Sequence, residues 1–271
     1  MKKDSAKVIW ERFQQESLTN KDLLLSTERK PIRIIPGVKI VKIGGQSITD
    51  RGRAALYPIL DEIVACRRKG KKIMLFSGGG TRARHAYQVA LDLELPPGFL
   101  AAIGGPIALQ NARMLQMLLA KHGGIYINAE QFEMLPLFFK LGCIPIMIGM
   151  PPYTYWEEIP KKGSIPDNRT DSGTFLTGEF LGADSVLYIK DENGLYTEDP
   201  KKNPKAEFIP KITVGELLKK DLGDLVVERV VLEYLSRAKN VKFVEIINGL
   251  VAGNITKALS GKHVGSRIYK D

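Results

Sequence analysis

Residues 71–87 read KKIMLFSGGGTRARHAY, and this stretch decides the fold. Its apolar run, IMLF, is typical of a strand buried on both faces of a sheet. Three glycines follow, and residues 81–95 then have the apolar spacing of a helix. Glycine lets backbone N–H groups approach a ligand closely, and the N-terminus of a helix attracts anions. The stretch therefore predicts an anion site that includes Gly79 and Gly80.

The rest of the chain repeats this alternation of short apolar runs and longer helical stretches. Further strands are predicted at 32–45, 124–128, 143–152, 184–191 and 242–249. Helices are predicted at 51–70, 81–95, 106–123, 171–182, 213–220 and 230–240. The pattern indicates an α/β fold in which helices cover both faces of a mostly parallel sheet.

The composition is that of a globular protein with a basic balance. Of 271 residues, 44% are apolar and 26% are charged, and the formal net charge is +10. Two interpretations of the basic clusters remain open: a solvated surface, or a positive field that concentrates small anions. The clusters are dispersed and match no nucleic-acid-binding motif, so we expect no nucleic-acid partner. No apolar run is long enough to cross a membrane and no signal peptide is visible, so we expect a cytoplasmic protein.

A second glycine pair, Gly44-Gly45, ends the strand predicted at 32–45, with Lys42 just before it. Two such loops on neighbouring strands could grip one polyphosphate, although glycines in two tight turns would look the same. The P-loop pattern is absent. Gly78, Gly80 and Ala83 do fit a dinucleotide fingerprint. That fingerprint also needs an acid about 20 residues further on, and residues 95–129 contain none.

Acidic residues in the second half complement these loops. Asp171 begins a predicted helix, where it could cap the N-terminus or orient lysines or Mg²⁺ around phosphates. Asp191 and Asn193 lie in a polar turn and could be purely structural.

Five segments in a fixed order resemble the amino acid kinase superfamily over residues 31–271. They are VKIGGQSI (41–48), FSGGGTRAR (76–84), RTDSGTFL (169–176), the segment 190–212 around NGLYTEDP, and INGLVAGNITKALSGKHVGSRI (247–268). The resemblance implies a three-layer α/β/α sandwich around a mostly parallel sheet of about eight strands. Residues 1–30 would be an N-terminal arm, 31–165 the acceptor or anion half, and 166–271 the ATP-binding half.

Two branches of the superfamily look similar. Thr170-Asp171-Ser172 and the GLYTEDP turn resemble uridylate kinases, which would make the chain an ATP-dependent UMP phosphotransferase. However, those enzymes place an acid after the glycine triplet, in the region that is acid-free here. KIGGQS, DRGRAALYP, TRARHAY, QNARML, NGLVAGN and GKHVGS resemble the molybdenum storage branch, and its beta-type subunits most of all.

The molybdenum storage resemblance implies ATP-dependent uptake of molybdate or tungstate, to which ATP hydrolysis could be coupled. The oxoanions would be held as polynuclear oxide clusters in a cage of six subunits. The cage would be a homo-hexamer or a hetero-hexamer with an alpha-type homologous subunit. The histidine-rich run of alpha subunits is replaced here by Thr154-Tyr155-Trp156, so the resemblance assigns no ligand to the stored metal.

The resemblance assigns roles position by position. Lys42 and Asp171 would be the catalytic pair, with Mg²⁺ accompanying ATP. Gly44, Gly45, Gly79 and Gly80 would hold the ATP phosphates. The nucleoside end would be lined by Lys190, Asp191, Asn193, Tyr196 and Pro200. The acceptor side would be formed by Arg82, Arg84 and His85.

Overall fold

The computed structural model describes residues 32–151, 159–160 and 163–271. Arg33–Asp271 forms one compact unit. The predicted arm at 1–30 and the segment Thr154-Tyr155-Trp156 lie outside the described residues.

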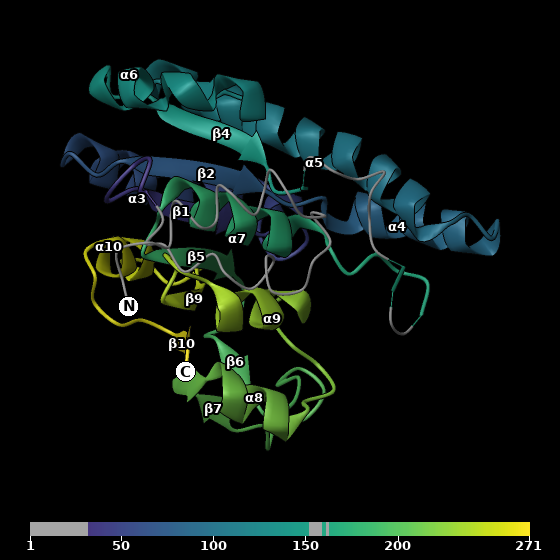
Figure 1. The fold of residues 1–271 in the computed structure, drawn as a ribbon. Helices are drawn as coiled ribbons and strands as arrows, with labels where there is room; N and C mark the ends of the chain where they lie inside the picture. Colours follow the sequence, from purple (N-terminus) through teal and green to yellow (C-terminus); the bar gives the residue numbers. More distant parts are fainter. Residues whose placement is uncertain (1–31, 152–158, 161–162) are drawn as a thin grey trace, which may run out of the picture. The chain divides into compact units, whose positions relative to one another are not determined.

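One sheet of eight strands organises this unit. Its strand order is β3-β4-β2-β1-β5-β9-β10-β8, and Figure 1 shows it running from β4 down to β10. All neighbouring pairs are parallel except β10 with β9. The strands are β1 Lys39–Ile43, β2 Ile73–Ser77, β3 Gly124–Tyr126, β4 Ile144–Ile148, β5 Ser185–Lys190, β8 Lys211–Thr213, β9 Phe243–Asn248 and β10 Ser266–Tyr269. A separate antiparallel pair is formed by β6 Leu195–Tyr196 and β7 Phe208–Ile209.

Helices cover both faces of the sheet, which confirms the predicted three-layer α/β/α fold. The α-helices are α3 Arg53–Arg68, α4 Gly80–Asp92, α5 Pro97–Leu119, α6 Leu135–Lys140, α7 Thr170–Leu181, α8 Val214–Lys220, α9 Val230–Arg237 and α10 Asn254–Leu259. Short 3₁₀ turns are η1 Thr49–Arg51, η2 Ala120–His122 and η3 Ala129–Met134.

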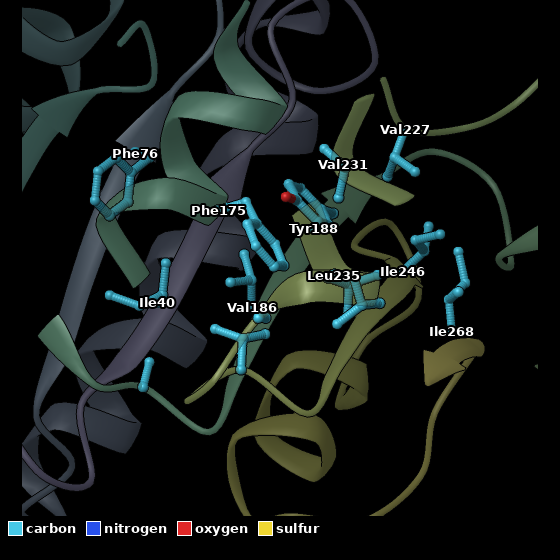
Figure 2. Packing of buried hydrophobic residues seen from close by; sticks show 14 of the residues in the cluster. Ile40, Phe76, Phe175, Val186, Tyr188, Val227, Val231, Leu235, Ile246 and Ile268 are labelled. Carbon is cyan, nitrogen blue, oxygen red and sulfur yellow. The ribbon is translucent and has the colours of Figure 1, made fainter. Parts of the chain in front are cut away.

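Alternate residues of each strand contribute to two apolar cores, one on each face of the sheet. On one face, Ile40 of β1 packs with Phe175 of α7 and Leu235 of α9, and Figure 2 shows this cluster around Phe175. On the other face, Val41 packs with Ile59 of α3 and with α5 and α10. Successive strand side chains point to opposite faces, so the face of every β1 residue is fixed.

The predicted helix at 106–123 is longer than expected. We expect Gly104-Gly105-Pro106 to interrupt a helix, because Gly and Pro are the weakest helix formers. Helix α5 nevertheless begins at Pro97 and runs through this triplet. It lies side by side with α4 (Figure 1), so tertiary packing outweighs the local preference.

Candidate functional site

Lys42, Asp171 and Lys190 form the centre of the site. Lys42 of β1 is in register with Tyr188 of β5, so Lys190, two residues further on, points to the same face of the sheet. That face is the one that α7 covers. Lys42 Nζ donates to Asp171 Oδ1 in the first turn of α7, and Lys190 Nζ lies 3.2 Å from Asp171 Oδ2. Lys190, expected at the nucleoside end, is therefore a partner of the central carboxylate.

Lys42 and Asp171 are buried and Lys190 is partly buried, and their charges shift the pKa values of Asp171 and Lys190. Burial by itself would raise the pKa of Asp171. The charges and hydrogen bonds of Lys190 and Lys42 outweigh that effect and hold the pKa well below its usual range. Burial lowers the pKa of Lys190, and the charge of Asp171 offsets this only partly. Asp171 is thus an anion with both oxygens bound to lysines.

The N-terminus of α7 is capped by a residue that the sequence analysis missed. Asp171 was a candidate cap, but the N-cap position belongs to Arg169 and the capping carboxylate comes from Glu228. Glu228 accepts from the backbone N–H of Asp171 at 2.9 Å, of Ser172 at 2.9 Å and of Arg169 at 3.1 Å. It is buried and lies 57 residues from Asp171 in sequence. No local sequence motif predicts a capping residue this far away in the chain.

The two glycine loops follow adjacent parallel strands and touch each other. A Cβ placed on Gly45 would lie 2.3 Å from Gly80 N, and one on Gly78 would lie 3.1 Å from Gly45 N. Real Cβ atoms essentially never approach within 3.0 Å. Gly80 also has φ +74°, which favours glycine. Gly45 and Gly80 are therefore required where the two backbones approach at the edge of the pocket, and Gly78 is tightly packed there.

The start of α4 is less open to a ligand than its sequence predicts. Asp50 Oδ2 accepts from the backbone N–H of Thr81 at 2.6 Å, and the backbone N–H of Asp50 donates to Gly45 O. A carboxylate of the protein therefore already occupies one of the N–H groups expected to receive an anion. Asp50 also ties the two glycine loops together.

Helical periodicity divides the residues predicted for the acceptor side. Gly80, Ala83, Arg84 and Tyr87 are spaced three or four apart on α4, and all four line the main pocket. Arg82 and His85 do not. His85 is exposed, while Arg82 donates to Asn111, whose amide donates to Gly78 O at 2.6 Å. Arg82 thus supports the glycine loop through Asn111.

The other residues predicted for the nucleoside end are divided between two pockets and a turn. Asp191 lines the main pocket and pairs with Arg51 and with Lys201. Burial opposes ionisation of Asp191, but Lys201 and Arg51 lower its pKa overall. Tyr196 and Pro200 line a small adjoining pocket with the apolar residues Leu225 and Val226, and Asn193 instead accepts from Asn248 at 3.1 Å.

The main pocket has a volume of about 670 Å³ and lies at the carboxyl ends of β1, β2 and β5. Ligands of open α/β sheets bind at this edge. Its described lining is asymmetric in charge. From residues 42–150 it includes Lys42, Arg51 and Arg84 and no carboxylate. Residues 169–228 contribute all five acids together with the cations Arg169, Lys190, Lys201 and Lys202. Such a site suits a nucleotide polyphosphate beside a second anion.

This fold and site define the class of protein. The model of the amino acid kinase family matches residues 37–242, and the chain belongs to this family.

Within the family, the chain is a homologue of the molybdenum storage protein subunit beta of Azotobacter vinelandii. The two are 46% identical over 259 residues, which cover 95% of this chain and 96% of the relative. The uridylate kinase of Thermococcus kodakarensis is 28% identical over 202 residues, covering 72% and 82% of the two chains. The solved structure of UMP kinase from Bacillus anthracis shares the fold, with a TM-score of 0.67, 18% identity and coverage of 87% and 96%.

Proposed function

We propose that this chain binds ATP and serves in the uptake and storage of molybdate or tungstate. The oxoanions would be held as polynuclear oxide clusters in a cage of six subunits, with ATP hydrolysis coupled to their uptake. Membership of the amino acid kinase family supports ATP binding. The 46% identity to a molybdenum storage protein subunit over nearly the whole chain supports the cargo.

The proposed nucleotide site combines the buried cluster with the glycine loops. Lys42 and Lys190 would neutralise phosphate charge, and Asp171 would hold both ammonium groups in place. The phosphates would lie against Gly44, Gly45, Gly79 and Gly80. Asp191, Asn193, Tyr196 and Pro200 would surround the nucleoside. The described residues contain no group of three or more acidic, histidine or cysteine side chains suited to a metal. Mg²⁺ would therefore be held largely by ATP phosphates and water, as is common for this ion.

The charge of the first half is the observation that carries the oxoanion proposal. Lys42, Arg51 and Arg84 are the charged groups of the described lining from residues 42–150. Lys42 pairs with Asp171 and Arg51 with Asp191, so Arg84 is the cation of this set that no described carboxylate neutralises. A small dianion is attracted by such a surface and needs no acidic partner. We therefore propose residues 31–165 as the acceptor half and residues 166–271 as the ATP half of the domain.

We further infer an oligomeric partner. The similar protein from Azotobacter vinelandii is called subunit beta, which supports an alpha-type homologous subunit as partner in a hetero-hexamer, with a homo-hexamer as the alternative. We propose a cytoplasmic location. Among the described helices, none is long and apolar enough to cross a membrane.

Metal content is the decisive measurement. The full chain is purified with and without an alpha-type partner after growth with molybdate or tungstate, then incubated with ATP and the same oxoanion. Metal per subunit is measured by mass spectrometry. We expect ATP-dependent loading, and we expect Arg84→Ala to reduce it. Background metal in the presence of the alpha-type partner would reject the proposal.

The second candidate is a nucleoside monophosphate kinase, favoured by the similarity to uridylate kinases. Lys42 and the glycine loops would equally serve transfer of the ATP γ-phosphate to UMP. A coupled assay of ADP release across nucleoside monophosphates distinguishes the two. Turnover that rises with UMP supports the kinase, whereas only basal hydrolysis with every acceptor rejects it.

A further inference from the structure

Tyr87 of α4 lies directly against Gly104 of α5 at the main pocket. A Cβ placed on Gly104 of α5 would lie 2.2 Å from the Tyr87 hydroxyl oxygen and 2.9 Å from Cζ of its ring. Both residues line the main pocket, and Gly104 is buried. The tyrosine is thus seated directly on the helix backbone, in space that any larger residue at position 104 would occupy.

The surroundings of Tyr87 match a small anion better than a nucleoside. Arg84 lies one helical turn away on the same face of α4. Arg169, Thr170 and Met150 line the same pocket. Sugar hydroxyls are hydrogen-bond donors and are well held by carboxylates. Residues 95–129, which include all of α5, contain no acid.

We propose that Tyr87 is a specificity-determining residue that closes the acceptor half to nucleosides and leaves room for a tetrahedral oxoanion beside Arg84. This inference rests on the proposed function and names how the same site selects its substrate class. The aromatic ring is rigid and has only two side-chain torsions, so it forms a wall that a ligand cannot easily displace. Exclusion of a competitor by an obstructing side chain is a common route to specificity.

The test compares Tyr87→Ala, Tyr87→Leu and Tyr87→Phe in the full chain, with Gly105→Ala as a control. A Cβ at Gly105 meets nothing within 4 Å, so that change should leave the pocket intact. UMP and ATP binding are each measured by calorimetry. In Tyr87→Ala we expect UMP affinity to rise by about tenfold or more, the scale of a removed steric obstruction in a pocket, with ATP affinity unchanged. Tyr87→Leu keeps an apolar contact if the alanine variant is unstable, and we expect a smaller gain.

Two outcomes overturn the inference. One is UMP affinity that stays at the wild-type value in both shortened variants while ATP still binds. The other is an equal gain in Tyr87→Phe, which would assign the exclusion to the hydroxyl rather than to the ring. The wild-type metal content, measured on the same preparations, reports separately on the proposed function. A loaded wild type with no gain of UMP binding rejects Tyr87 alone.

Discussion

The contact between the two glycine loops gives the sharpest test of the nucleotide site. Gly45→Ala adds one methyl group at a position where φ is not in the left-handed region, so the backbone itself is not strained. The added carbon would lie 2.3 Å from Gly80 N and 2.6 Å from Gly80 Cα. Both neighbours are backbone atoms and cannot rotate away as a side chain would. One loop must therefore move.

The size of the movement follows from these distances. Ordinary contact begins at 3.4 Å, so the loops must separate by roughly 1 Å, and such overpacking costs about 1–3 kcal/mol of folding stability. If both loops hold one polyphosphate, the same displacement misplaces half of the phosphate site. Misplacement of this size costs on the order of 100-fold in catalytic rate, and we expect ATP affinity to fall as well because half of the phosphate contacts are displaced.

Calorimetric titration with ATP and urea unfolding of the same samples separate the two effects. Gly105→Ala is the matched control: it adds the same methyl group in open space, and within a helix it should stabilise by about 0.5–1 kcal/mol. ATP affinity within threefold of wild type in a folded Gly45→Ala protein would refute the idea that the two loops hold one ligand.

The buried charges give three further predictions. Asp171→Asn leaves one buried and one partly buried ammonium group, those of Lys42 and Lys190, without their anion. We therefore expect urea unfolding to show a loss of about 3–5 kcal/mol, and unchanged stability would contradict the role of Asp171 in holding the two lysines. The folded-state pKa of Asp171 lies below its unfolded value. The ionised carboxylate therefore stabilises the fold fully above about pH 4, and this stabilisation is lost as the pH falls further. In acid titrations, Asp171→Asn should accordingly lose less folding stability below pH 4 than the wild type does. Glu228→Gln leaves one of three N–H groups poorly paired and should cost about 1–3 kcal/mol and weaken ATP binding. Glu62→Gln is its control, since Glu62 accepts from Gly253 and Thr256 outside the pocket, so it should lower stability but leave ATP affinity unchanged.

Local patterns predicted the layers of this fold well. Each central strand is a short apolar run, and glycines follow β1 and β2, so these patterns predict the strands. The alternation of strands with helices predicts their parallel pairing. The shortest elements gave no such signal. Helices α6 and α10 have six residues each, and β6 and β7 have two, too few for any period to show.

The site was predictable only where its residues share an element. The periodicity of α4 alone would have separated Arg84 from Arg82 and His85, because only the first lies in the stripe that begins at Gly80. The link from Lys190 to Lys42 could not be predicted in this way. It depends on β5 lying beside β1, which is a property of strand order across 148 residues of sequence.

The structure indicates a different source for the site's attraction for anions than the sequence does. Its sequence suggests that helix dipoles attract the ligand, but two helices that border the pocket are capped by the protein's own carboxylates, α4 by Asp50 and α7 by Glu228. The attraction must therefore come chiefly from side-chain cations. Lys42 and Lys190 are paired with one anion, Asp171, and the charge of Glu228 also acts on Lys190. A phosphate entering there would meet lysines that are at least partly buried, where attraction is stronger than at the surface. Screening by salt should consequently affect ATP binding less than it would at an exposed basic patch.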